Sequence, residues 1–160
     1  MAKAAKINIF SENIHENLGI NEKKATQIAR KILGVYLGNK KILNSSCLFG
    51  QKFDCLSFDI LYCGDEKIHR INKEYRHKDY PADVITFAIF ADSEDKFIFD
   101  GEINLGEIII SLDKINANSL EKGCSFEDEL YFLISHGIMH LLGFDHQTDE
   151  EYNFIIEMQN

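Results

Sequence analysis

Hydrophobic positions recur along the chain with two different periods, which predict a mixture of helices and strands. Between residues 25 and 37 apolar side chains return every three or four positions, so we predict a helix that Asn21 caps and Gly38 ends. Residues 55–63 alternate instead, which is typical of a strand. The residues expected on its inner face are Leu56, Phe58, Ile60 and Tyr62.

The same patterns predict the remaining elements. Strands are expected at 6–10, 84–90 and 105–111, and helices at 65–77, 112–122 and 125–142, with a short last helix opened by Thr148. In the helix at 65–77, Ile68, Ile71 and Tyr75 should face inward. The helix at 125–142 is apolar on nearly all sides and should be buried. This order predicts an α+β fold, a mixed sheet of about four strands covered by helices, in one domain spanning residues 1–160.

The apolar runs and the cysteines of the sequence indicate the cellular compartment. No apolar run is long enough to cross a bilayer, and the first residues lack the apolar stretch of a secretory signal. The four cysteines are scattered and form no C-x-x-C pair, which favours reduced structural thiols. We therefore expect a cytoplasmic protein that does not contact membranes.

The charge is acidic overall but uneven. A net charge of −9 argues against nonspecific binding to nucleic acid. Between residues 67 and 78, however, five basic side chains are opposed only by Glu74. Such a local stripe can contact phosphate; it consists of Lys67, Arg70, Lys73, Arg76 and Lys78.

Three histidines near the C-terminus have the spacing of metal ligands. His136 and His140 are four residues apart on a predicted helix, so their side chains share one face about 5–6 Å apart. Gly143 lets the chain turn, and His146 can return as a third ligand. Three nitrogen ligands with an open fourth position predict one catalytic zinc ion per chain. For the other histidines we expect His15 in a surface loop, His69 exposed on a helix and His77 within the basic stripe.

This spacing matches the ligand pattern H-E-x-x-H-x-x-G-x-x-H of the metzincin proteases, with one difference. Gly137 stands where those enzymes carry the glutamate that acts as general base. The interpretation as a peptidase is therefore disfavoured, because the general base is missing. Asp145 is a candidate for orienting a ligand imidazole and equally for a loop turn residue.

Three segments resemble one protein family. Residues 136–146 read HGIMHLLGFDH, residues 71–87 read INKEYRHKDYPADVITF, and residues 105–111 read LGEIIIS. These are similar, in the same order, to the signatures of the YbeY endoribonucleases, which are bacterial ribosomal-RNA maturation factors. The chain departs from the usual residues in three places: Ala82 replaces threonine, Ala88 proline and Glu107 aspartate.

The resemblance implies a three-layer α/β/α domain in which His136, His140 and His146 hold the zinc. It implies a single-strand-specific endoribonuclease that acts in 3′-end maturation of small-subunit ribosomal RNA and in late ribosome quality control, with Arg76 as a catalytic residue. Single-stranded RNA and the ribosome are the implied partners, and DNA is not expected. From the residues alone, the Arg76 guanidinium suits a phosphate but equally a surface salt bridge with Asp79.

Two other functions stay open at this point. One is a different metal-dependent hydrolase such as a peptidase, which Gly137 disfavours. The other is a ribosome assembly factor without catalytic activity, in which the metal serves only stability.

Overall fold

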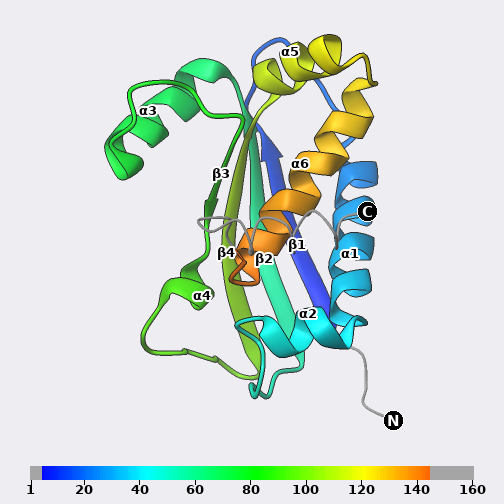
Figure 1. The fold of residues 1–160 in the computed structure, drawn as a ribbon, viewed down its shortest axis with the longest axis vertical. Coiled ribbons are helices and arrows are strands. Elements are labelled where there is room, and N and C mark those ends of the chain that lie inside the picture. The colour runs from blue at the N-terminus through cyan, green and yellow to red at the C-terminus, as the bar shows by residue number, and fades with distance from the viewer. Residues whose placement is uncertain (1–4, 145–160) are drawn as a thin grey trace.

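A computed structural model describes residues 5–144, and in this part of the chain four strands form one mixed sheet in the order β1-β2-β4-β3 (Figure 1). Strand β1 runs parallel to β2 and β2 parallel to β4, whereas β3 is antiparallel to β4. The strands are β1 (Lys6–Asn13), β2 (Cys55–Cys63), β3 (Val84–Phe87) and β4 (Glu102–Ser111). The helices are α1 (Glu22–Leu37), α2 (Lys40–Ser45), α3 (Asp65–Arg76), α4 (Ile89–Asp92), α5 (Leu112–Lys122) and α6 (Phe126–Leu141).

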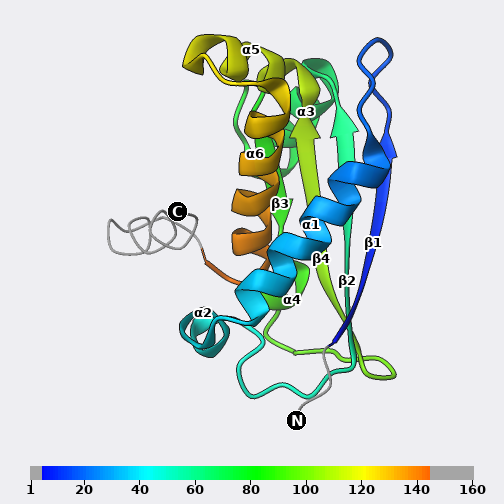
Figure 2. The ribbon, with the colours of Figure 1, turned by 90° about the vertical axis from the view of Figure 1, so that its right-hand side faces the viewer.

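Helices cover both faces of the sheet, which confirms the predicted three-layer arrangement. Helices α1 and α6 lie next to each other on one face (Figures 1 and 2), where the inward side chains of β2 are buried as expected. On the opposite face Ile68 of α3 packs with Ile85 and Ile109, so α3 forms the third layer. No helix in residues 5–144 is long and apolar enough to cross a membrane.

Strand β3 ends earlier than the sequence predicts, beside a β-bulge in β4. The pairing of β2 with β4 shifts by one residue beside Leu105, and Gly106 then adopts a φ of 132°. The carbonyl oxygen of Phe87 approaches Gly106 so closely that a Cβ there would lie 1.9 Å from it. Bulges interrupt the ladder and bend the strand. The strand expected at 84–90 therefore stops at Phe87, and Ile89–Asp92 form one helical turn, α4.

Other local expectations also need correction. Tyr75 is 62% exposed, because Asn72 takes the buried position and donates its side-chain amide to the Tyr80 carbonyl. Helix α2 was not predicted, although Asn39 caps it by accepting from the backbone N–H groups at 41 and 42. Strand β1 extends to Asn13, because pairing with β2 outweighs the polar residues at its end. The helix expected after Thr148 lies outside the described residues.

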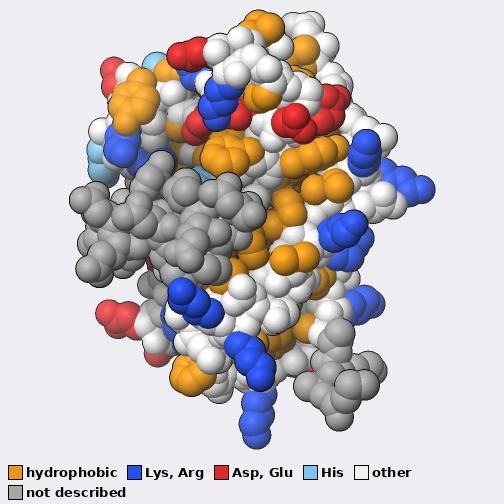
Figure 3. Space-filling view, turned by 45° about the vertical axis from the view of Figure 1, so that its right-hand side comes forward, with side chains coloured by type: hydrophobic (Ala, Val, Ile, Leu, Met, Phe, Trp, Pro, Cys, Tyr) orange, Lys and Arg blue, Asp and Glu red, His pale blue; other side chains and the backbone are white. Residues whose placement is uncertain are grey.

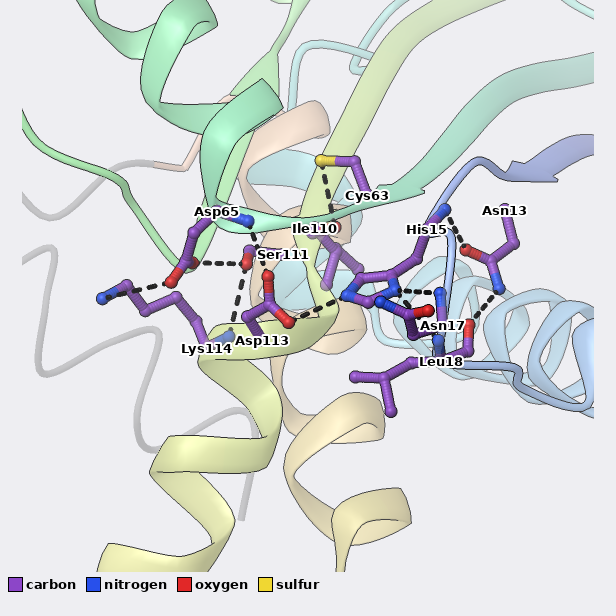
Figure 4. Close-up of polar contacts among 10 residues, drawn as sticks. All are labelled: Asn13, His15, Asn17, Leu18, Cys63, Asp65, Ile110, Ser111, Asp113 and Lys114. Carbon is purple, nitrogen blue, oxygen red and sulfur yellow. Dashed lines mark hydrogen bonds and ion pairs between the residues drawn. The ribbon is translucent and has the colours of Figure 1, made fainter.

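A polar network joins the carboxyl ends of the three parallel strands (Figure 4). His15 lies in a loop, but its side chain is only 9% exposed, so it is not the surface residue that the sequence suggested. Its Nδ1 accepts from the backbone N–H groups of Asn17 and Leu18, so Nε2 carries the proton and donates to Asp113 at 2.8 Å. Asp113 also accepts from the N–H of Asp65, at the start of α3.

Asp113 should make stability depend on pH. The hydrogen bond from His15 holds the Asp113 pKa below its usual range, so its stabilising effect is complete above the ordinary carboxyl pKa. That effect is lost as pH falls through the lowered pKa. We expect Asp113→Asn to reduce the free energy of unfolding at pH 7 by about 1 kcal/mol, since the carboxylate is partly solvated. The difference from wild type should vanish toward pH 2 in chemical denaturation. Asp95→Asn is the control on an exposed loop; equal losses for both variants would contradict the assignment.

Candidate metal centre and groove

The rings of His136 and His140 converge on one point. One helical turn separates the two residues on α6, and their Nε2 atoms lie 3.0 Å apart with the rings at 78° to each other. Two nitrogens that share a tetrahedral zinc ion at about 2.0–2.1 Å are separated by about 3.3 Å. The pair therefore fits a common metal ion with little movement.

The third predicted ligand, His146, and its neighbour Asp145 lie outside the described residues. Among residues 5–144, no group of three or more His, Cys, Asp or Glu side chains is arranged to hold a metal. What the structure supplies is the turn that leads toward His146. Gly143 has a φ of 97° and donates its N–H to the His140 carbonyl, so α6 ends where the spacing predicted.

A groove of about 930 Å³ brings Arg76 to the same site as the two histidines. Its walls come from the end of α3 and the following loop, from β3, from α5 and from α6. Arg76 is exposed, and the salt bridge with Asp79 that the sequence left open is not formed. Asp79 instead contacts His69 at 2.8 Å and Lys73 at 3.9 Å. In residues 5–144 no carboxylate forms an ion pair with Arg76, so its guanidinium is available to the groove.

Charged side chains of both signs line the groove. Lys78 and Lys114 join Arg76 as cations, while Asp83 and Asp92 are the acidic members. The Lys114 ammonium lies 4.0 Å from Asp65, which ties this wall of the groove to the network at the strand ends. Arg76 and Lys78 belong to the basic stripe at 67–78, and the tertiary fold adds Lys114 from α5 to them.

Asp83 and Asn118 are groove residues that sequence reasoning missed. The Asp83 carboxylate accepts from its neighbour's N–H at 2.8 Å and from the Asn118 amide at 3.5 Å. The same amide group donates to Glu129 at 3.2 Å, and Lys122 pairs with Glu129 at 2.8 Å. This network fixes β3, α5 and α6 relative to one another. Asp83 could have been found from the sequence, because it lies in the 71–87 segment that resembles the family signature. Nothing in the sequence distinguishes Asn118.

Gly137 faces the sheet rather than the groove. A Cβ at this position would lie 2.9 Å from Cγ2 and 3.0 Å from Cδ1 of Ile108, on β4. Contacts this short require the neighbour to move. The glycine therefore lets α6 lie close against the sheet, and a glutamate side chain here would begin inside the core.

These features define an α+β protein in which a histidine pair and an exposed arginine line one groove. Comparisons with known proteins identify its family. A family model described as "Endoribonuclease YbeY" matches residues 10–160. The chain is 36% identical over 160 residues to an Endoribonuclease YbeY of Acetivibrio thermocellus, covering 94% of this chain and 91% of that one. It is 34% identical to one from Fusobacterium nucleatum, covering 96% and 83%.

The chain therefore belongs to the endoribonuclease YbeY family. Among solved structures it resembles the solution structure of a Thermotoga maritima protein, with a TM-score of 0.53 and 22% identity, over 94% of this chain and 85% of that one. At that identity the likeness concerns the fold, and it agrees with the layers described above.

Gly137→Glu should destabilise the fold without creating a peptidase. Overpacking against Ile108 costs about 1–3 kcal/mol, and an unpaired carboxylate in the core adds to this. We expect a lower melting temperature and no cleavage of casein. Gly34→Glu is the matched control, because a Cβ at Gly34 meets nothing within 4 Å. A Gly137→Glu variant that melts with the wild type, or that cleaves casein, would show that the position has been misjudged.

Proposed function

We propose that the protein is a zinc-dependent, single-strand-specific endoribonuclease that acts in 3′-end maturation of small-subunit ribosomal RNA and in late ribosome quality control. The curated relatives carry the name endoribonuclease, which supports the reaction class. The observation that carries the proposal is the placement of His136, His140 and Arg76 on one groove.

The donor set suits the proposed metal. Imidazole nitrogens are common zinc ligands, and His136 and His140 direct theirs to one point, with His146 as the third proposed ligand. A bound zinc ion would supply Lewis acidity at the phosphate to be cleaved. Three protein ligands leave one coordination position for the reaction, which distinguishes a catalytic zinc site from a structural one.

Arg76 is the residue proposed to bind the phosphate. Its guanidinium is always charged and presents a planar set of donors that matches two phosphate oxygens. From the groove wall it would bind the phosphate and stabilise the charge that grows on its oxygens during cleavage. The side chain of Arg76 would therefore help to orient the substrate in the groove that it shares with the histidines.

The metal assignment predicts about one zinc ion per chain in the wild type. A His136→Ala/His140→Ala double variant should lose nearly all of it, because two of three ligands are gone. His69→Ala is the control, since His69 is hydrogen-bonded to Asp79 outside the groove. Elemental analysis of the three purified proteins decides, and equal zinc in the double variant and the wild type would refute the site.

The arginine assignment predicts a loss of activity without a loss of metal. Arg76→Ala should cleave single-stranded RNA about a hundredfold more slowly, which is typical of removing one group that stabilises transition-state charge. Arg76→Lys should recover only part, because a point charge binds one oxygen at a time. Arg70→Ala, on the same helix but outside the groove, should behave as wild type. Full activity of Arg76→Ala with normal zinc would leave Arg76 as an ordinary surface residue.

A further inference from the structure

Phe132 is an exception on the buried helix α6. Its neighbours Leu130, Leu133 and Ile134 are at most 4% exposed, whereas the Phe132 side chain is 42% exposed. It lies one turn before His136, and the two rings are nearly parallel, at 20°, with their centroids 6.5 Å apart. Phe132 is also part of the groove wall. An aromatic ring is thus held at the solvent surface beside the histidine pair.

A fixed cation accompanies this ring. The Lys122 ammonium lies 4.9 Å from the centroid of Phe132, a cation–π contact, and pairs with Glu129 at 2.8 Å. Glu129 is only 2% exposed and also accepts from Asn118, so the anchor of this lysine is rigid. The Lys122 side chain as a whole remains half-exposed. Hydrophobic side chains also gather in a band on the face shown in Figure 3, with most charged groups around its margin.

We propose that Phe132 is a stacking platform for one unpaired nucleobase of the RNA, next to the nucleotide whose phosphate lies at His136 and His140. An exposed ring in a groove with cations is the combination by which proteins bind single strands: the ring contacts the base, and here the groove cations Arg76, Lys78 and Lys114 would attract the phosphate backbone. A base in a duplex already stacks on both faces, so the platform selects unpaired RNA. This inference rests on the proposed endoribonuclease function and assigns a binding subsite to it.

The test measures stacking directly with short single-stranded RNAs that carry 2-aminopurine at one position at a time. Stacking on an aromatic ring quenches this fluorescent base, so one position should be quenched when wild-type protein binds in stopped flow. Phe132→Leu should abolish that quenching, weaken Kd about five- to a hundredfold, and raise KM with kcat nearly unchanged. Phe132→Trp should restore the quenching and the affinity for RNA. Zinc content and melting temperature should stay near the wild type, because the side chain is exposed.

Phe99→Leu is the matched control, since Phe99 is 72% exposed and lies outside the groove. RNA cleavage by the wild type together with unchanged quenching and Kd in Phe132→Leu would overturn the subsite and leave the endoribonuclease assignment intact. Quenching that depends on Phe132 in a wild type that cleaves no RNA would support the subsite and refute the proposed activity. A wild type that neither binds nor cleaves single-stranded RNA would refute both.

Discussion

The close contact between α6 and β4 at Gly137 and Ile108 determines where the site lies. Because Gly137 has no Cβ, α6 lies low against the sheet, and its rotation is fixed by that contact. Two further contacts hold the same helix: the Ser135 hydroxyl hydrogen-bonds to Tyr36 of α1, and Glu129 binds groups on α5. With these sides of α6 engaged, His136 and His140 project along the remaining side, toward the groove. The orientation of the histidine pair is thus set by packing at a residue that lies outside the groove.

The bulge at Leu105 and Gly106 lies beside the end of β3, which contributes to another part of the groove lining. Had β3 continued to residue 90, the sheet would extend under the space in front of α6. The approach of the Phe87 carbonyl to Gly106 ends the ladder instead, and the chain turns away into α4. Thr86 and Ala88, on either side of Phe87, line the groove as a result. The close approach that a glycine permits at position 106 is thus linked to the end of β3, whose last residues border the groove.

Local features were predictable from the sequence, whereas features that depend on distant contacts were not. The spacing of His136 and His140 is a property of one helix, and so is the turn at Gly143, so both follow from sequence alone. The end of β3 depends on a glycine nineteen positions further on, and the exposure of Phe132 cannot be read from a helix that is apolar on nearly all sides. Periodicity also assigned Tyr75 to the core, because it could not anticipate that the Asn72 amide finds a carbonyl partner there.

The overall charge constrains how the groove can hold RNA. At −9 the surface as a whole repels polyphosphate, and attraction acts only within about 8 Å at physiological salt. The cations Arg76, Lys78 and Lys114 therefore act only on the stretch of RNA that enters the groove, where Asp83 and Asp92 already offset part of their field. So weak an ionic contribution needs a partner that salt does not screen, and an exposed ring such as Phe132 provides one. If Phe132 stacks on an unpaired base as proposed, single-strandedness would be the basis of selection, and the shortage of positive charge would make that contact the more important for affinity.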